Sequence, residues 1–339
     1  MRKNFREKSF ILAVTTLLVI SFFATAGFGA EKIQVTVTGA GKGAWAYHGM
    51  AAVTETVNRN SKTIQVTNRE SGGFVEGTRL LGTNRIQVAM TNGPFVDSWQ
   101  MKKDPFKRDT GARDTLRGIG PSSVSVLHIA VLKDSNIKTF MDLKGKRVSL
   151  GPKGSNAFWM IGFALKAAGI LDTVRQDSLN WSDGATYMVD RKLDAFGIPN
   201  PLPGPAILQA SYSAPIRILD LPDQVIDKFI EFSPGYHKEV VDPRDLYKGM
   251  EGQKFTTVAY MIMLVANKET PDDIIYEILR HTYDPKNRDL MVGIAKGWGE
   301  GLDRAKNGEW LERLKAAGGK LHPGAARYWK EKGINVAGY

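Results

Sequence analysis

Ile33-Gln-Val-Thr-Val-Thr38 runs directly into Gly39-Ala-Gly-Lys-Gly43. The first stretch alternates apolar and polar residues, which predicts a strand, and the second is a glycine-bearing loop. A helix is predicted next, because Tyr47, Met50, Val53 and Val57 recur at helical spacing along one face. A strand, a glycine loop and a helix in this order form the unit from which a parallel sheet with covering helices is built.

The same unit recurs along the chain, so the sequence predicts an α/β protein. Each further unit is recognised by a short apolar strand that ends at a loop rich in glycine, serine, asparagine or proline. These units are the strand 63–67 with Ser71-Gly-Gly73, the strand 86–90 with Thr91-Asn-Gly-Pro94, the strand 147–150 with Gly151-Pro-Lys-Gly-Ser155, and the strand 193–196 with Gly197-Ile-Pro-Asn-Pro201. A further helix, predicted to be capped by Ser182-Asp183, lies between the last two strands.

The units fall into two groups, which predicts two lobes. The chain is expected to pass between them at His128–Leu132 and at Met261–Ala266, both of which are apolar strands. The first lobe then comprises residues 27–126 plus 265–339, and the second comprises residues 127–264. Two passages of this kind can act as a hinge.

The N-terminus has the pattern of an export signal. Met1–Lys8 is basic, Phe10–Phe23 carries no charge, and Ala24-Thr-Ala26 supplies small residues for cleavage. Residues 1–26 are therefore predicted to be a signal peptide. An uncleaved anchor is the alternative, although the apolar run is short for a membrane span.

The 339 residues contain no cysteine. An exported protein of this composition has no disulfide framework, so its stability must come from an ordinary core. It also lacks a cysteine for lipid attachment. We therefore expect the mature protein to diffuse freely in the periplasm.

The formal net charge of +11 suits an acidic partner or ligand. Nucleic acid is not expected, because basic residues are interspersed with acidic ones and no nucleic-acid-binding motif is present. A merely solvated basic surface is the open alternative.

Sequence motifs for catalysis are absent. The 5 histidines lie far apart without metal-ligand spacing, no Gly-x-Ser-x-Gly elbow occurs, and a cysteine nucleophile is impossible. We expect no enzyme activity, no metal and no cofactor.

The glycine loops predict a site for an anion. In open α/β sheets, ligands bind beyond the carboxyl ends of the strands, where helices begin. Helix starts present unpaired N–H groups and a positive dipole end, and glycine lets the backbone approach the ligand closely. Two such loops are expected in each lobe, so all four would converge on one cleft if the lobes face one another.

Several blocks, in their order and spacing, carry a family resemblance. They are Gly39–Tyr47; Ser71-Gly-Gly73 with Val75-Glu76 and Arg79-Leu-Leu81; Asp142–Val148; Gly151–Ser155; Gly197–Pro201; and His322-Pro-Gly-Ala325 with Tyr328 and Glu331-Lys-Gly333. Over the whole mature chain, the sequence resembles the solute receptors of tripartite ATP-independent periplasmic (TRAP) transporters, of the TAXI class.

The resemblance implies a type II periplasmic-binding-protein fold, two α/β lobes that close around a ligand cleft. It also implies delivery of the solute to a TRAP membrane permease, driven by an ion gradient. The ligand would be held by hydroxyl side chains, backbone N–H groups and a tyrosine of the first loop. Together with the glycines and polar residues beside these loops, the expected binding residues are Lys42, Gly43, Trp45, Tyr47, Ser71, Gly72, Gly73, Phe74, Asn92, Gly154, Ser155, Asn156 and Asn200.

The chain departs from the family pattern where aromatic residues enter the loops. Ala44-Trp45-Ala46-Tyr47 stands where the family often has Gly-Thr-Tyr-Tyr, so one tyrosine is lost and a tryptophan appears. Phe74 replaces a serine, and Trp159 follows the third loop. We hypothesise an aromatic wall that favours an apolar or aromatic carboxylate, or a sulfonate. The alternative is that these side chains belong to the core.

The sequence thus predicts a monomeric receptor for a small anionic organic solute, which is a carboxylate, an amino acid or a sulfonate. Its partner would be a TRAP-type permease. Two alternatives remain open: a receptor that presents its ligand to a membrane signalling protein, and a periplasmic enzyme acting on a small anionic substrate.

Overall fold

A computed structural model describes residues 31–42 and 44–339. The predicted signal peptide, residues 1–26, and the loop residue Gly43 lie outside the described residues. Within the described part of the chain, no helix is both long enough and apolar enough to cross a membrane.

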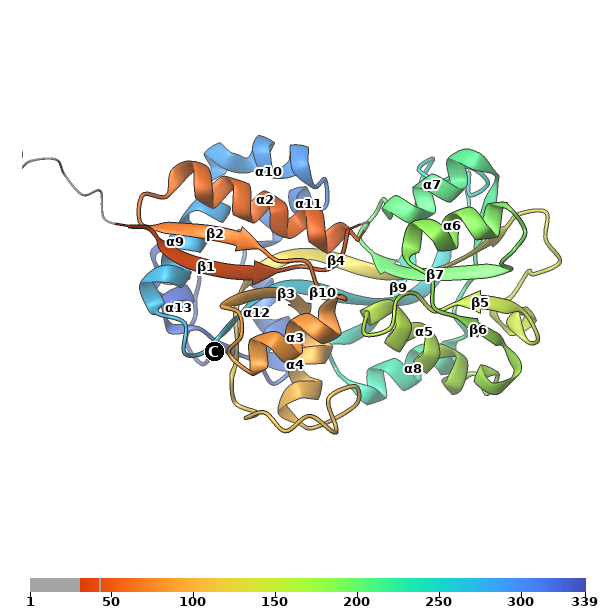
Figure 1. Cartoon of the computed structure of the whole chain (residues 1–339), viewed down its shortest axis with the longest axis horizontal. Coiled ribbons are helices and arrows are strands. Elements are labelled where there is room, and N and C mark those ends of the chain that lie inside the picture. The colour runs from red at the N-terminus through yellow and green to blue at the C-terminus, as the bar shows by residue number, and fades with distance from the viewer. Residues whose placement is uncertain (1–30, 43) are drawn as a thin grey trace, which may run out of the picture. The chain divides into compact units, whose positions relative to one another are not determined.

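One mixed sheet runs through the described residues (Figure 1). Its main path is β2-β1-β3-β10-β4-β7-β5-β6, with β8 and β11 paired to β4 and β9 paired to β10. The strands are β1 (Ile33–Thr38), β2 (Ile64–Asn68), β3 (Val88–Asn92), β4 (Leu116–Leu132), β5 (Arg147–Ser149), β6 (Arg175–Asp177), β7 (Ala195–Asn200), β8 (Ile216–Ile218), β9 (Tyr236–Val241), β10 (Phe255–Asn267) and β11 (Lys320–Leu321).

Helices cover both faces of this sheet. Figure 1 shows α2 on one side of β1 and β3, and α3 and α4 on the other. The α-helices are α2 (Trp45–Asn60), α3 (Phe74–Gly82), α4 (Gly93–Gln100), α5 (Asn156–Ala167), α6 (Trp181–Val189), α7 (Pro205–Ser213), α8 (Asp223–Phe232), α9 (Asp272–Thr282), α10 (Arg288–Ile294), α11 (Trp298–Arg304), α12 (Glu309–Ala316) and α13 (Pro323–Glu331); the 3-10 helices are η1 (Phe140–Leu143), η2 (Leu171–Thr173) and η3 (Pro285–Asn287).

Most of the predicted strand–loop–helix units are present, but two predicted loops are partly strand: β3 includes Thr91 and Asn92, and β7 includes Gly197 to Asn200. β1 leads into α2, and β2 leads into α3, whose first residue follows Gly73 directly. On the predicted face of α2, Met50, Val53 and Val57 are buried, whereas Tyr47 in the first turn is only half-buried. The apolar strands β3 and β10 are almost wholly buried, because helices cover both faces of the sheet around them.

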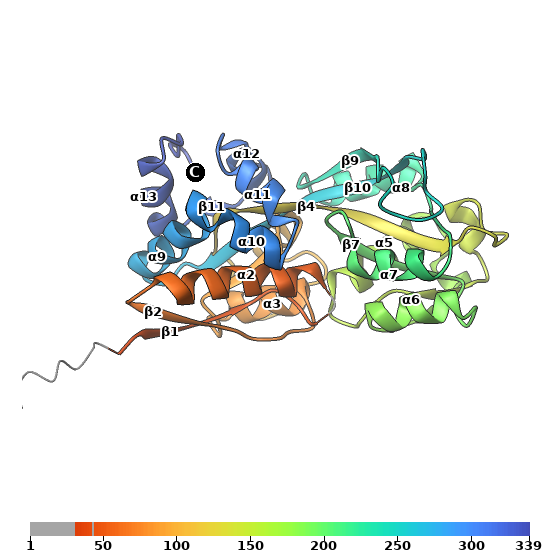
Figure 2. The ribbon, with the colours of Figure 1, turned by 90° about the horizontal axis from the view of Figure 1, so that it is seen from above.

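Two long strands, β4 and β10, join the two ends of the sheet, as Figure 2 shows for β4. β10 pairs with β9 over 255–260 and with β3 over 262–266. β4 pairs with β11 at 117–118 and with β7 over 126–130. The stretch 128–132, at which we expected a passage between lobes, belongs to the part of β4 that pairs with β7 and β8.

His128 is a buried polar residue on β4. Its Nδ1 lies 3.3 Å from the carbonyl oxygen of Ile198, and its Nε2 lies 3.3 Å from the hydroxyl of Tyr247. Burial lowers the pKa of His128 to about 4 from the ordinary 6.5, because the charged imidazole loses its hydration. The side chain is therefore neutral in the folded protein at neutral pH.

This burial predicts acid sensitivity. The unfolded chain takes up a proton below pH 6.5 while the folded His128 does not, so stability is full above that pH and falls as the pH drops towards 4. The loss amounts to at most ~3 kcal/mol for this histidine. Urea unfolding at pH 7 and pH 5 should show a smaller loss in His128→Gln than in the unchanged protein. His48→Gln, at an exposed histidine, should keep the full loss; equal losses in all three proteins would contradict the assignment.

Candidate functional site

The start of α5 is fixed by a serine cap. Ser155 is 1% exposed, and its Oγ accepts a hydrogen bond of 3.1 Å from the backbone N–H of Phe158. Gly151 and Gly154 have φ values of +84° and +83°, which let the loop turn before the helix. The first N–H groups of α5, on Asn156 and Ala157, have no acceptor within the helix.

The start of α3 meets the start of α5. Gly73 has φ +122° and ψ −162°, a conformation that essentially only glycine adopts. A Cβ at this position would lie 3.2 Å from the Cα of Ser155. Loops from opposite ends of the sheet are therefore in direct contact.

The start of α6 places an indole beside them. The cap is Asn180, whose side chain accepts from the N–H of Asp183 at 2.9 Å, rather than the predicted Ser182-Asp183. An asparagine three residues before an acidic residue is the capping signal that would have found it. Trp181 is then the first helical residue and is 7% exposed.

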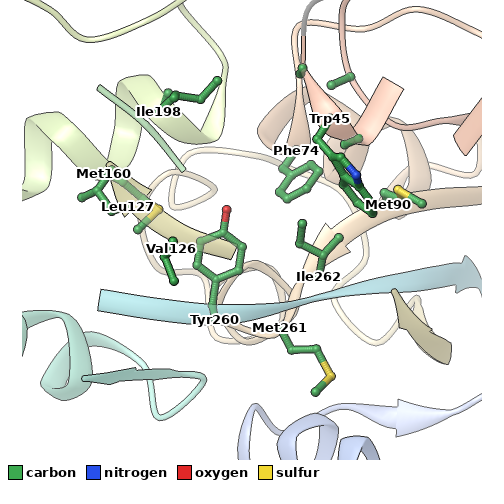
Figure 3. Packing of buried hydrophobic residues seen from close by; sticks show 14 of the residues in the cluster. Trp45, Phe74, Met90, Val126, Leu127, Met160, Ile198, Tyr260, Met261 and Ile262 are labelled. Carbon is green, nitrogen blue, oxygen red and sulfur yellow. The ribbon is translucent and has the colours of Figure 1, made fainter. Parts of the chain in front are cut away.

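These loops enclose one cavity with about 30 Å³ of free volume, room for about two water molecules, so a larger solute needs the lining side chains to move. The residues that begin α2, α3, α5 and α6 line it, together with the end of β7 and the middle of β10. Figure 3 shows Tyr260 and Ile262 on the side of β10 that faces Phe74 and Ile198, with Met261 on the opposite side. The lining residues are Ala40, Ala44, Ala46, Gly73, Phe74, Ser155, Asn156, Ala157, Trp181, Ile198, Pro199, Asn200, Tyr260 and Ile262.

Three buried polar atoms of the lining have no hydrogen-bond partner. They are Nε1 of Trp181, Nδ2 of Asn200 and Oδ1 of Asn156. The Nδ2 of Asn156 donates to the hydroxyl of Tyr260 at 2.6 Å. Unpaired groups of this kind also occur elsewhere in the described residues, such as Nε1 of Trp310, but these three lie together in the cavity lining and are free to bond a ligand.

The electrostatics of the cavity come from backbone and amide groups. Among the described residues that line it, none carries a charged side chain. Burial raises the pKa of the Tyr260 hydroxyl, so this group stays protonated at neutral pH. The four helix starts turn their positive dipole ends towards the cavity, which favours an anion.

Five of the predicted binding residues line the cavity, and others lie beside it. The five are Gly73, Phe74, Ser155, Asn156 and Asn200. Lys42, Ser71 and Gly72 line a neighbouring, more open hollow that also reaches Trp181. Gly43 lies outside the described residues.

Four predicted residues do not line the cavity. Trp45 packs against Gly49, and the ring of Tyr47 meets the ring of His48 edge-on at 5.5 Å. Asn92 caps α4 by accepting from the N–H of Phe95 at 2.7 Å. A Cβ atom added at Gly154 would have no other atom within 4 Å, so this position faces open space.

The hypothesised aromatic wall is built from different residues than expected. Of Trp45, Phe74 and Trp159, only Phe74 lines the cavity. Trp159 is half-buried and packs against the core, with its ring centroid 5.1 Å from that of Phe163. Trp181 and Tyr260 supply the other rings, and sequence reasoning missed both.

A metal site is not found in the described part of the chain, where no three histidine or acidic side chains lie together as ligands. The cavity lining also contains no histidine, aspartate, glutamate or lysine. Acid–base catalysis needs a group of this kind within reach of the substrate.

Comparison with solved structures defines the class of fold. A structure from Bordetella bronchiseptica RB50 matches with a TM-score of 0.53 and 14% identity, over 89% of this chain and 98% of that chain. A structure described as a periplasmic transporter matches with a TM-score of 0.52 and 14% identity, over 86% of this chain and 96% of that chain. A structure described as the periplasmic sulfonate-binding protein of a putative sulfonate ABC transporter, from Methylobacillus flagellatus KT, scores lower, with a TM-score of 0.46 and 13% identity over 85% of this chain and 86% of that chain. The chain has the periplasmic-binding-protein fold, as predicted.

The family follows from a separate comparison. The model of the NMT1-like family matches residues 37–333, which is most of the chain. The protein belongs to the NMT1-like family.

Proposed function

We propose that the protein is an exported solute receptor that closes around a small anionic organic solute and delivers it to a membrane permease. The observation that carries this proposal is the meeting of four helix starts at one largely buried cavity whose N–H donors lack partners. In this proposal the first lobe is 27–126 plus 265–339, and the second is 127–264. The mature protein works in the periplasm as a monomer.

Contacts between the proposed lobes indicate a closed state. Besides the contact of Gly73 with Ser155, the ring centroids of Phe95 and Trp159 lie 5.7 Å apart. The Nζ of Lys103 donates to the carbonyl oxygen of Phe232 at 3.1 Å. Opening would separate these pairs by bending β4 and β10, and a solute that bridges the lobes would shift the equilibrium back to the closed form.

The permease is proposed to be of the TRAP type, on the strength of the motif resemblance. Uptake into vesicles that contain such a permease should require this protein and an ion gradient, and should not require ATP. Uptake that depends on ATP would contradict the TRAP assignment and leave the receptor function intact.

The receptor function is tested by identifying what the protein holds. Native mass spectrometry of the protein purified without denaturation should show a bound small molecule that is lost on unfolding. Refolded protein should rebind this solute in a 1:1 ratio. A protein that neither carries nor rebinds any small molecule from its native extract would contradict the proposal.

Trp181→Phe tests the cavity directly. The phenyl ring keeps most of the apolar contact but removes the unpaired N–H, so solute affinity should fall about tenfold, ~1.4 kcal/mol. The stability of the free protein should not fall by the same amount, because the lost N–H had no partner there. Calorimetric titration and thermal unfolding measure the two effects.

Trp310→Phe is the matched control. Trp310 is also buried with an unpaired Nε1, but it does not line the cavity. Its substitution should leave solute affinity unchanged. Equal affinity losses in both variants would show that the effect is not local to the cavity.

A further inference from the structure

The cavity lacks a partner for a positive charge on its ligand. Three carboxylates lie within three residues of cavity-lining positions in the sequence, but none of the three lines the cavity itself. Glu70 accepts from the N–H of Lys42, Glu76 accepts from the N–H of Gly72, and Asp183 accepts from the side chain of Asn180. Glu70 thus joins its loop to the one before α2, whereas Glu76 and Asp183 are bonded within their own loops, and Glu70 and Asp183 line the neighbouring open hollow rather than the cavity.

Two of the three unpaired side-chain atoms of the cavity are donors, and the third, Oδ1 of Asn156, is an acceptor. Nε1 of Trp181 can only donate, and Nδ2 of Asn200 is likewise an N–H donor. The amide of Asn156 can turn over, since its oxygen and nitrogen are interchangeable in shape. In the turned orientation its Oδ1 accepts from the Tyr260 hydroxyl, and its Nδ2 becomes a third donor towards the cavity.

The backbone also favours a negative group over a positive one in the cavity. The starts of α2, α3, α5 and α6 bring positive dipole ends to the same space, which stabilise a negative group and disfavour an ammonium. A buried ammonium needs a charged or multiple hydrogen-bonding partner to offset its lost hydration. The side-chain acceptors of the cavity are the Oγ of Ser155, which already caps α5, the amide oxygens of Asn156 and Asn200, and the Tyr260 hydroxyl.

We infer that the site selects monoanions whose carbon next to the acid group carries no ammonium, and that it discriminates against α-amino acids. This inference rests on the proposed function and narrows its solute class. The acid group binds the N–H donors of Trp181, Asn200 and Asn156. The body of the solute packs against Phe74 and Ile262.

The test uses ligands that share a carbon skeleton and differ in charge. Calorimetric titration compares 4-methylpentanoate, leucine and 3-methylbutylamine, and then 3-phenylpropionate, phenylalanine and 2-phenylethylamine. At least one of the two acids should bind, at least tenfold more tightly than its amino acid, and neither amine should bind. An amino acid that binds as well as its des-amino acid, or binding by neither acid, would overturn the inference.

Asn156→Asp provides the reverse experiment. A carboxylate at this position should weaken binding of the acid at least 100-fold and raise the affinity for the matching amino acid relative to it. Asn307→Asp adds the same charge at an exposed loop position and should leave both affinities unchanged. An unchanged preference in Asn156→Asp would also overturn the inference.

Failure of this inference and failure of the proposed function can be told apart. A receptor that carries an amino acid from its native extract remains a solute receptor, although the selection against α-ammonium groups would then be wrong. A protein that carries and rebinds no solute contradicts the receptor function itself.

Discussion

Gly73→Ala should weaken solute binding about 30-fold or more, ~2 kcal/mol. Two effects combine in the closed state. The backbone conformation, with φ +122° and ψ −162°, is strained for any residue with a Cβ, and the added methyl would lie 3.2 Å from the Cα of Ser155. In an open state the loop has no opposing residue and can relax. The penalty therefore falls mainly on closure, and calorimetry measures it as lost affinity.

Gly154→Ala is the matched control for backbone strain. Gly154 also has a positive φ, +83°, but a Cβ atom added there would have no other atom within 4 Å. Its strain would be the same in the open and closed states and would cancel in binding. Affinity should stay within about threefold, ~0.6 kcal/mol. Equal losses in the two variants would show that backbone strain, and not the contact between the loops, controls binding.

Ser155→Asp should abolish binding of an anionic solute while the protein stays folded. Aspartate is as good a helix cap as serine, so it should keep the hydrogen bond from the N–H of Phe158 and the start of α5. Its charge would face the anion inside the cavity. At a separation of ~5 Å and an effective dielectric constant of about 20, the repulsion is ~3 kcal/mol, or more than 100-fold in affinity.

Two further variants separate the roles of Ser155. Ser155→Ala removes the cap without adding charge, so it should cost ~1 kcal/mol of stability. Thr139→Asp makes the same change of charge at the cap of η1, which does not line the cavity, and should leave affinity unchanged. Retained anion binding in Ser155→Asp would show that the acid group does not bind at the start of α5.

Local patterns in the sequence were sufficient for the parts of the site that begin helices. The motif Gly151–Ser155 before an apolar helix predicted the loop that presents Ser155 and Asn156, because a cap and a turn depend on a few adjacent residues. The loop before α3 was found in the same way. Trp45 was misjudged from the same kind of pattern, since a residue at a helix start can face either the ligand or the core.

The side chains that complete the cavity had no local signal. Tyr260 lies in an uninterrupted apolar strand, where it looks like any other core residue. Its hydroxyl matters only because β10 passes beneath the start of α5, so that it meets Nδ2 of Asn156, 104 positions away in the chain. Trp181 likewise becomes part of the site only through its place opposite Gly73 and Phe74.

The sequence by itself determined the α/β class and the glycine loops at the helix starts, because strand alternation, helical spacing and capping depend on residues that are close together in the chain. Only the tertiary structure decided which loops touch, which aromatic rings line the cavity and which N–H groups lack a partner. These properties depend on pairs such as Gly73 with Ser155, which lie far apart in the chain and meet only when β4 and β10 bring the two ends of the sheet together.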